Sequence, residues 1–386
     1  MSGNDDVIEQ ISVESGTLSD WLNPLTKPLR HKLGLVGLLG LAILPVLLTP
    51  LQALQIAGAY FFAMFVMSWD VVSGYTGQIS FGHGVFFAVG GYASALLNIR
   101  MGIDPLLAIP VGVVAAALAG LIIGVPALRL RGPYLSLVTL IVPLIVAQIF
   151  NVYSNVFGGT QGLVSPPPDR LLGLGSGAPL MTYYVAFALF VVILAVLLAV
   201  TRSDAGKVFT AIRESEDAVS SAGLNPAKFK IFAFVLSAAI GGLAGAAFVH
   251  TVGEPTPNAL LDLFVSIEII IAAILGGMGT IVGAAIGGLF FAVFRGVLAD
   301  LTFQIPVVNA TIAEVDLVLF AVLSLLVIYL LPGGLLRGVV LAGQRIVGSP
   351  GGTEEDVAAD GGARASPLQQ VRDTWADVLG GDDDER

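Results

Sequence analysis

The feature that most constrains this chain is a series of long apolar runs, many of them about 20 residues in length. A run of this length, folded as a helix that rises about 1.5 Å per residue, covers a hydrocarbon layer about 30 Å thick. Only helices and closed barrels satisfy their backbone hydrogen bonds in lipid, and continuous apolar runs lack the alternation of barrel strands. The sequence therefore predicts an all-α polytopic membrane protein.

About ten of these runs, bounded by charges, prolines and polar clusters, are candidate spans. They cover residues 33–49, 51–69, 81–99, 106–126, 134–153, 180–200, 230–250, 263–276, 281–297 and 315–331. The two runs that flank the segment Gly276 to Gly283 are short and are joined by Gly-Gly-Met-Gly-Thr. They form two spans, one broken helix or a re-entrant pair. We therefore expect about eight to ten transmembrane helices, with broken or re-entrant segments.

The composition agrees with a chain whose main solvent is lipid. Charged residues make up 12% of the 386 residues, whereas a soluble domain carries roughly 25%. The net charge of −10 comes from the two tails. We expect an acidic N-terminal segment at 1–32, a transmembrane domain at 33–335 and an acidic, mostly disordered tail at 347–386. The absence of cysteine excludes disulfides, thiolate metal ligands and cysteine nucleophiles.

The basic residues predict the orientation, because Lys and Arg gather on the cytoplasmic side of a membrane. With the N-terminus inside, cytoplasmic segments receive all of the 18 basic residues except Arg100, Arg170 and Arg295. We therefore expect a multi-pass protein of the plasma membrane whose N- and C-termini are both cytoplasmic.

The largest predicted internal loop, 203–225, has the densest charge of the membrane domain. Ser203 or Asp204 can cap a helix start, and Gly223 can take the left-handed conformation that ends one. The pattern predicts one amphipathic helix of about five turns. Its apolar stripe consists of Val208, Ile212, Val219 and Ala222. The residues alone leave open whether this helix lies in the lipid head groups, packs on its neighbours or docks a partner.

Particular motifs resemble those of a known family. The run Ala211-Ile-Arg-Glu-Ser-Glu-Asp-Ala218, followed by Ala222-Gly-Leu-Asn225, resembles the cytoplasmic signature of branched-chain amino acid permeases of ABC transporters. Gly74-Tyr-Thr-Gly-Gln-Ile-Ser-Phe-Gly-His-Gly84 and Leu275-Gly-Gly-Met-Gly-Thr280 are similar to the same family. Its M-type subunit is indicated by Arg131-Gly-Pro-Tyr134 and Gly158-Gly-Thr-Gln-Gly162. The resemblance covers roughly residues 35 to 335.

This resemblance implies the partners and the role of the internal loop. A homologous H-type permease, two ABC ATPase subunits and an extracytoplasmic solute-binding protein are the expected partners, and the loop helix docks into the ATPase. The expected ATPase-coupling residues are Asp204, Gly206, Ala211, Arg213, Glu214, Ala218 and Gly223. The expected substrates are branched-chain amino acids, with urea and short amides as alternatives because their importers use closely similar permeases.

Polar and glycine-rich backbone within a membrane domain must face protein or a water-filled cavity. The segment 74–84 and the acidic residue of the run 263–276 are therefore candidates for a translocation path. The expected path residues are Gly77, Gln78, Ser80, His83, Glu268, Gly276 and Gly277. An acid within an apolar run, such as Glu268, costs roughly 2.5 kcal/mol or more on insertion scales and normally finds a partner. The alternative is that the glycines permit tight packing and the polar groups satisfy one another.

Two other transport classes remain open at the level of sequence. An ion-coupled secondary carrier could use Glu268 and His83, and a channel for a small neutral solute would need no energy source. No Gly-x-x-x-x-Gly-Lys-Ser/Thr motif occurs, so the chain does not itself bind and hydrolyse ATP. We expect no catalytic residue, cofactor, metal or nucleic acid partner.

Overall fold

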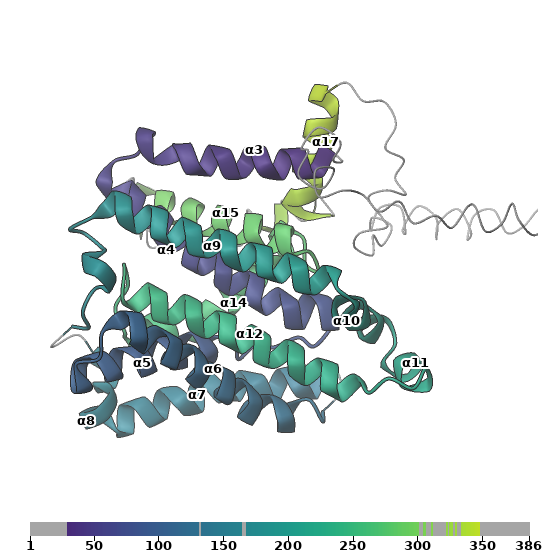
Figure 1. Ribbon diagram of the computed structural model, residues 1–386, viewed down its shortest axis with the longest axis horizontal. Helices are drawn as coiled ribbons and strands as arrows, with labels where there is room; N and C mark the ends of the chain where they lie inside the picture. Colours follow the sequence, from purple (N-terminus) through teal and green to yellow (C-terminus); the bar gives the residue numbers. More distant parts are fainter. Residues whose placement is uncertain are drawn as a thin grey trace, which may run out of the picture.

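The computed structural model describes residues 29–130, 133–163, 167–300, 304–305, 310–311, 322, 324–326, 329 and 333–347. Most helices lie side by side along one common direction (Figure 1). The predicted tail beyond residue 347, residues 1–28 and most of the predicted span 315–331 lie outside the described residues.

The helices follow one another with short connections. They are α3 (Leu29–Ile43), η2 (Leu44–Leu47), α4 (Pro50–Asp70), η3 (Val71–Tyr75), α5 (Gly84–Met101), α6 (Pro105–Ala127), α7 (Pro133–Val152), α8 (Ser154–Phe157), η4 (Gly159–Gln161), η5 (Leu171–Gly173), α9 (Pro179–Arg202), α10 (Asp204–Glu214), α11 (Glu216–Ser221), α12 (Pro226–Val249), α13 (Pro257–Leu260), α14 (Leu263–Gly276), α15 (Ile281–Asp300) and α17 (Gly334–Val347). Two short antiparallel strands, β1 (Gln304–Ile305) and β2 (Ala310–Thr311), pair with each other.

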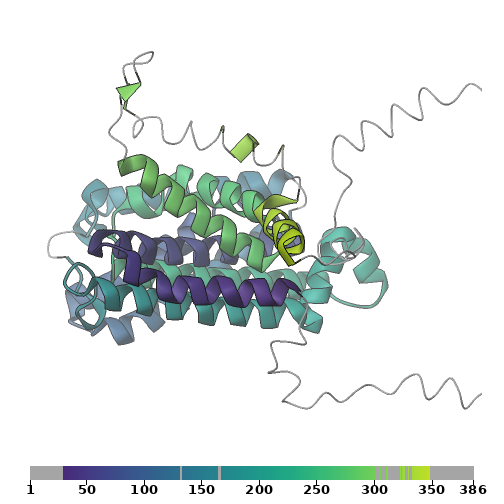
Figure 2. The ribbon, with the colours of Figure 1, turned by 90° about the horizontal axis from the view of Figure 1, so that it is seen from above.

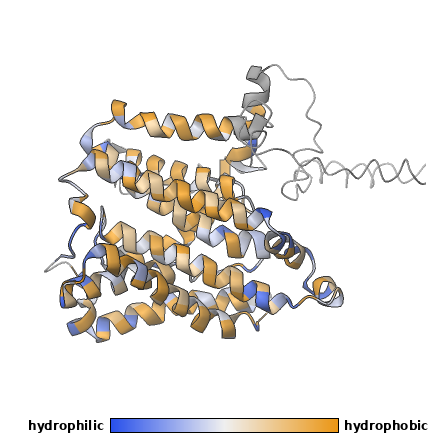
Figure 3. Ribbon diagram, viewed as in Figure 1, coloured by the Kyte–Doolittle hydropathy of each residue, from blue (hydrophilic) through white to orange (hydrophobic). Residues whose placement is uncertain are grey.

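Within the described residues, seven helices are long and apolar enough to cross a membrane. They are α4 together with η3, α5, α6, α7, α9, α12 and α15. Two shorter apolar helical segments, Leu33–Leu47 and Phe264–Gly276, add to them. Figure 3 shows apolar residues along the lengths of these helices and polar residues gathered at their ends. The prediction of an all-α polytopic membrane protein is confirmed.

Side-chain caps explain where several spans begin. The Thr49 hydroxyl accepts a hydrogen bond from the Gln52 amide at 3.3 Å, and the Gln52 side chain accepts one from the Thr49 amide at 2.9 Å. This reciprocal pair satisfies two amides at the start of α4, and Pro50 fits the first helical position. Asp104 caps α6 with a single bond, since its carboxylate accepts a hydrogen bond from the Leu106 amide at 2.8 Å. These caps satisfy amides that have no partner within the first turn of each helix.

The centre of the bundle is formed by α4 and α12, whereas α6, α7 and α9 are exposed along most of their length. Glycines let α5, α6 and α12 approach closely. A Cβ at Gly90 would lie 2.5 Å from the Gly242 Cα, and one at Gly112 would lie 2.6 Å from the Gly90 carbonyl oxygen. Close backbone approach through small residues is the usual way in which membrane helices associate. The exposed apolar surfaces of the outer helices fit a lipid environment.

Two of the spans begin partway through the bundle. After α4 and one turn of π-helix, η3, the chain is irregular from 77 to 83, and α5 begins beside the middle of α12. There His83 Nε2 donates to the Ser237 hydroxyl at 2.6 Å, and that hydroxyl donates to the Ser68 carbonyl. The start of α14 is also held at this level, because the Gly84 amide donates to the Ser266 hydroxyl at 3.4 Å.

Within the described residues, the segment Gly276 to Gly283 is not a break within one helix. α14 and α15 are two separate helices joined by a turn that includes Gly277 and Gly279, both with positive φ. With 14 residues, α14 is about 21 Å long and is too short to cross a hydrocarbon core of about 30 Å. The helices α10 and α11 project from one end of the bundle in both views (Figures 1 and 2). We refer to that end as the α10 end.

Candidate functional site

The segment between α9 and α12 forms two helices, so the prediction of one helix of five turns is wrong. α10 begins after Ser203, but Ser215 has an extended backbone (φ −159°, ψ 105°), and its hydroxyl accepts a hydrogen bond from the Ala218 amide at 3.3 Å. A serine that caps a new helix in this way competes with continuation of the old one. The buried face consists of Phe209, Ile212 and Val219. Ala222, which the predicted stripe included, is exposed.

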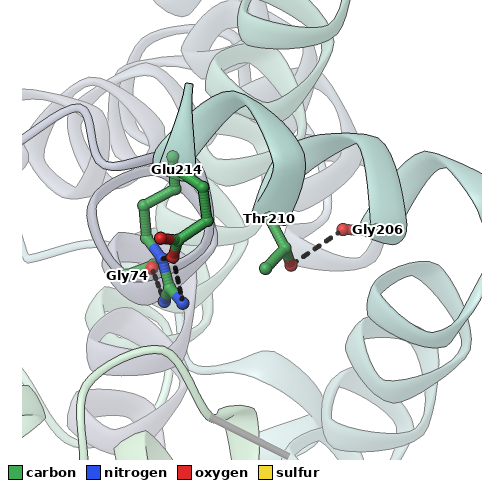
Figure 4. Close-up of polar contacts among 5 residues, drawn as sticks. Gly74, Gly206, Thr210 and Glu214 are labelled. Carbon is green, nitrogen blue, oxygen red and sulfur yellow. Dashed lines mark hydrogen bonds and ion pairs between the residues drawn. The ribbon is translucent and has the colours of Figure 1, made fainter. Parts of the chain in front are cut away.

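Arg213 connects α10 to the irregular segments of the membrane domain. Its Nη1 donates to the Gly74 carbonyl at 2.9 Å, while its guanidinium also contacts the Glu214 carboxylate at 3.2 Å (Figure 4, in which Gly74 and Glu214 are labelled). A Cβ at Gly77 would lie 3.0 Å from the Arg213 Cγ, and one at Gly279 would lie 2.8 Å from its Nη1. The arginine therefore packs against both glycine-rich segments.

A second contact joins the same two segments directly. The Gly279 amide donates to Asp70 Oδ1 at 2.8 Å, which links the end of α4 to the turn between α14 and α15. A Cβ at Gly74 would lie 2.6 Å from the Gly279 nitrogen, so this approach requires glycine. We call Asp70, Gly74, Arg213 and Gly279 the α10 junction.

The other predicted coupling residues divide into an outer and an inner set. The outer set is exposed on α10, on α11 or directly after it, and consists of Asp204, Ala211, Glu214, Ala218 and Gly223. A hydrogen bond from Lys207 at 2.9 Å lowers the pKa of Asp204 below its ordinary value. Gly206 is buried, and the Thr210 hydroxyl donates to its carbonyl at 3.2 Å (Figure 4). Gly223 has the left-handed conformation, with φ +84°.

α11 is fastened to α12 by a buried cation. Lys230 Nζ lies 2.8 Å from the Glu216 carboxylate, and the lysine side chain is only 3% exposed. Burial of this kind requires a paired charge. α10 and α11 are thus each attached to the membrane domain by a basic side chain.

Among the predicted path residues, Ser80 and His83 are buried, Gln78 is half-buried and Gly77 is exposed. The segment that carries them is tied to α4, since the Trp69 indole donates to the Ser80 carbonyl at 2.7 Å and the Ser73 hydroxyl donates to the Gln78 carbonyl at 3.1 Å. These contacts agree in part with the alternative that the polar groups of this segment satisfy one another, but the Ser80 hydroxyl and His83 Nδ1 are buried without a hydrogen-bond partner among the described residues.

The predicted glycines at the end of α14 have packing roles. A Cβ at Gly276 would lie 2.7 Å from the Gly283 carbonyl carbon and 2.8 Å from the Gly287 nitrogen, so Gly276 lets α14 and α15 pack backbone to backbone. Gly277 has φ +120°, which disfavours other residues, and begins the turn between the two helices.

Glu268, in contrast, lines a cavity of about 300 Å³ between α4, α5, α12, α14 and α15. Its carboxylate forms an ion pair with Arg295 of α15; the Glu268 side chain is 8% exposed and that of Arg295 is 44% exposed. We call this space the aromatic cavity. Its other lining residues are Gly58, Phe62, Phe65, Phe87, Phe248, Asp262, Phe264 and Val265.

The sequence interpretation missed most of this cavity. Arg295 lies two residues before the end of the predicted span 281–297, but α15 continues to Asp300, so Arg295 lies within the helix. Opposite charges in two neighbouring apolar runs were the available signal. The phenylalanines carried no signal, because an aromatic side chain on an apolar helix resembles any core residue.

The fold and this cavity define a class. Several apolar helices enclose a cavity with an ion pair at membrane depth, and ionisable groups in this position typically mark the pathway of a polar solute. The chain is a multi-pass membrane protein of the transport class.

Comparison with known proteins identifies the family. The family model described as "branched-chain amino acid transport system / permease component" matches residues 54–332. The permease protein LivM of the high-affinity branched-chain amino acid transport system of Escherichia coli is 31% identical over 295 residues, covering 70% of this chain and 69% of the relative. This chain therefore belongs to that permease family, with M-type relatives, and it is a transport subunit and not an enzyme.

More distant relatives include both permease types. A probable branched-chain amino acid permease LivM of Methanocaldococcus jannaschii is 25% identical over 271 residues, covering 65% of this chain and 78% of the relative. A probable permease LivH of the same organism is 29% identical over 219 residues, covering 54% of this chain and 68% of the relative. No solved structure matches the chain. The two names indicate a family in which permeases occur as a pair.

Proposed function

We propose that this chain is the M-type permease of an ATP-driven importer of branched-chain amino acids and that it forms the translocation path with a homologous H-type permease. The relatives' names supply the substrate class. The observation that carries the ATP-driven part is the α10 junction, through which an exposed helix contacts both irregular segments of the membrane domain.

Two ABC ATPase subunits are the partners of the permease pair, and one of them docks on the outer face of α10 and α11 of this chain. Acidic and basic side chains both occur there, which favours a protein partner over anionic lipid. The α10 end is then cytoplasmic, as are both termini, and the plasma membrane is the location. An extracytoplasmic solute-binding protein delivers substrate at the opposite end.

The α10 junction explains how a movement of the ATPase can reach the membrane domain. A displacement of α10 moves Arg213, whose hydrogen bond and packing act on Gly74 and on the turn at Gly279. These two points lie at the ends of α4 and α14, so both helices receive the displacement together. Packed side chains and hydrogen bonds of this kind carry energetic coupling between distant sites when the elements they join have two arrangements.

The test is to replace Arg213 by Met in the assembled importer, reconstituted with its ATPase and binding protein. A hydrogen bond to a charged group contributes about 1.5–3 kcal/mol, so loss of the Gly74 contact is expected to lower leucine transport about tenfold or more while ATPase association persists. Arg129→Met is the matched control, because Arg129 is exposed just after α6 and does not belong to α10 or α11. Normal transport by the Arg213→Met importer would remove the coupling role.

Substrate class and energy source need separate measurements. Uptake of leucine, urea and acetamide by the same importer distinguishes the three proposed substrate classes. A secondary carrier is the second candidate, since Glu268 is a buried carboxylate at membrane depth. Uptake that persists without the ATPase, and stops when an uncoupler is added at constant ATP, would favour that candidate.

A further inference from the structure

We propose that the aromatic cavity is the binding site for the transported amino acid as a zwitterion. Arg295 binds its carboxylate, the acidic side chains Glu268 and Asp262 bind its ammonium group, and the phenylalanine rings enclose its aliphatic side chain. This inference rests on the proposed function, because it takes an amino acid as the solute.

The charges in the cavity match both ends of a zwitterion. The guanidinium of Arg295 offers paired donors in the geometry of a carboxylate, and the carboxylates of Glu268 and Asp262 accept from an ammonium group. In the structure, Glu268 and Arg295 pair with each other. A zwitterion that enters between them replaces one ion pair by two, so neither charge is left uncompensated at membrane depth.

The walls of the cavity match an aliphatic side chain. Phe62 and Phe65 come from α4, Phe87 from α5 and Phe248 from α12. The rings pack against one another, with centroids 4.8 Å apart between Phe65 and Phe87. A volume of about 300 Å³ lies at the lower limit of small-molecule pockets. The cavity therefore suits a solute of a few apolar carbons.

Its position suits a solute that crosses the membrane. Phe248 lies at the end of α12 that is remote from the α10 end, whereas Phe65 and Glu268 lie on the parts of α4 and α14 that run toward the α10 end. The cavity therefore extends through the middle of the membrane domain. The bond between Gly84 and Ser266 connects the start of α14, which lines the cavity, to the segment that Arg213 contacts. Binding of a solute in the aromatic cavity and movement of α10 can thus affect each other.

A neighbouring cavity differs in its chemistry. It measures about 470 Å³ and is lined almost entirely by apolar side chains of α6, α9 and α12, such as Leu106, Val192 and Leu243. It holds no charged group that could bind an ammonium or a carboxylate. The same molecule thus offers an apolar cavity for comparison with the charged one.

The experiment measures binding of radiolabelled L-leucine to the purified complex of permeases and ATPases in nanodiscs, without the binding protein. L-Leucinamide, which lacks the carboxylate, and 4-methylpentanoate, which lacks the ammonium group, serve as competitors. We expect leucine to bind and both analogues to compete at least about tenfold more weakly than unlabelled leucine. Equal competition by all three compounds would overturn the proposal.

Charge variants identify the cavity as the place of binding. Arg295→Met and Glu268→Gln are each expected to weaken leucine binding about tenfold or more. The double variant removes both charges together, so a merely structural ion pair predicts normal leucine affinity in the protein that folds. The proposal predicts normal folding with lost affinity. Arg202→Met, which removes an exposed charge at the end of α9, is the matched control and is expected to leave affinity unchanged.

A cavity-filling variant tests the proposal without altering charge. At Gly58 the nearest atom to a new Cβ is Val252 Cγ2, 3.9 Å away, so Gly58→Leu adds a side chain beside the cavity without a clash at its Cβ. It is expected to abolish leucine binding at an unchanged melting temperature. Gly37→Leu on α3, where no described residue lies within 4 Å of a new Cβ, is the control. Unchanged binding by Gly58→Leu would overturn the proposal.

Different results would contradict the proposed function and the proposed binding site. A complex whose ATPase remains associated and drives leucine transport, but in which cavity variants bind leucine normally, retains the proposed function and loses the cavity site. A permease with which no ATPase associates, and which transports no leucine, loses the proposed function itself.

Discussion

Gly90 is a residue at which three helices, α5, α6 and α12, pack backbone to backbone. A Cβ there would lie 2.5 Å from the Gly242 Cα of α12, and the Gly90 carbonyl itself faces Gly112 of α6. Gly90→Ala is expected to destabilise the protein by about 1–3 kcal/mol, because the two helices must separate to admit the methyl group. The measurement is the melting temperature in detergent. Gly37→Ala has open space around its Cβ and provides the control; equal melting temperatures would contradict the packing role.

His250 predicts how stability depends on pH. It lies just beyond α12, where its Nδ1 donates to the Asp169 carbonyl at 2.8 Å. Burial lowers its pKa, assisted by the charge of Arg170 and opposed by Asp169 and by the backbone contact with Ser94. The folded pKa is therefore below the unfolded value of about 6.5, so stability is complete above that pH and falls as the pH drops through it.

The corresponding experiment compares melting temperatures at pH 7.5 and pH 5.5. One unit below the unfolded pKa, the cost is up to about 1.4 kcal/mol, or roughly 2–4 °C in a protein of this class. His250→Gln keeps a donor for Asp169 but cannot ionise. A wild-type protein that loses no more stability on acidification than this variant would show that His250 does not titrate in this range.

Among single residues, the sequence predicted correctly that Glu268 needs a partner but did not predict which residues surround it. An acid in an apolar run requires a partner, and the structure supplies Arg295. The partner could not be chosen from the sequence, since an arginine near the end of a run is equally well satisfied by head groups. Gln78 and His83 were chosen for their polar character, but they contact Ser73 and Ser237 and do not line the aromatic cavity. Gly77 is exposed and packs against Arg213.

Among the elements, α11 depends on one buried ion pair. Glu216→Gln leaves the Lys230 ammonium without its carboxylate, and Lys230 is almost fully buried. Breaking a buried pair costs about 3–5 kcal/mol, but Glu216 is 25% exposed, so water and salt reduce this value. We expect amide hydrogen exchange in 216–222 to accelerate about tenfold while exchange in α10 is unchanged.

The control for this prediction is Glu214→Gln, which removes a carboxylate of α10 that is 70% exposed. Equal acceleration in both variants would mean that α11 is held by general charge and not by Lys230. A double variant, Glu216→Gln with Lys230→Met, removes both charges and is expected to exchange more slowly than the single variant.

The helices could be predicted from the sequence where the length of an apolar run determines the structure. They could not be predicted where single hydrogen bonds determine where a helix begins or ends. The apolar runs correspond to α4, α6, α7, α9 and α12 because lipid leaves a long apolar segment no other structure. The break at Ser215 depends on one hydroxyl capping an amide three residues later, and the helical pattern continues through it. The start of α5 beside Ser237 depends on tertiary contacts that no local pattern carries.

At the scale of the whole molecule, the proposed coupling contacts and the proposed binding site lie at different levels of the bundle. The α10 end carries Arg213 and the two glycine-rich turns, whereas the aromatic cavity extends from the level of Phe65 in α4 to that of Phe248 at the far end of α12. α4 passes both, since Asp70 belongs to the α10 junction while Gly58, Phe62 and Phe65 line the cavity. Because α4 is buried along most of its length, it is the element best placed to connect them.

The charges predict the orientation of the molecule, and it can be measured directly because the chain contains no cysteine. Ser203→Cys places a thiol at the exposed start of α10, and Thr160→Cys places one on the exposed connection at the opposite end. In intact cells a membrane-impermeant maleimide is expected to label Thr160→Cys but not Ser203→Cys, which reacts only after permeabilisation. Phe61→Cys, at a buried position of α4, is the unreactive control. The reverse pattern would place α10 outside, where no ATP is available, and would exclude an ATPase as its partner.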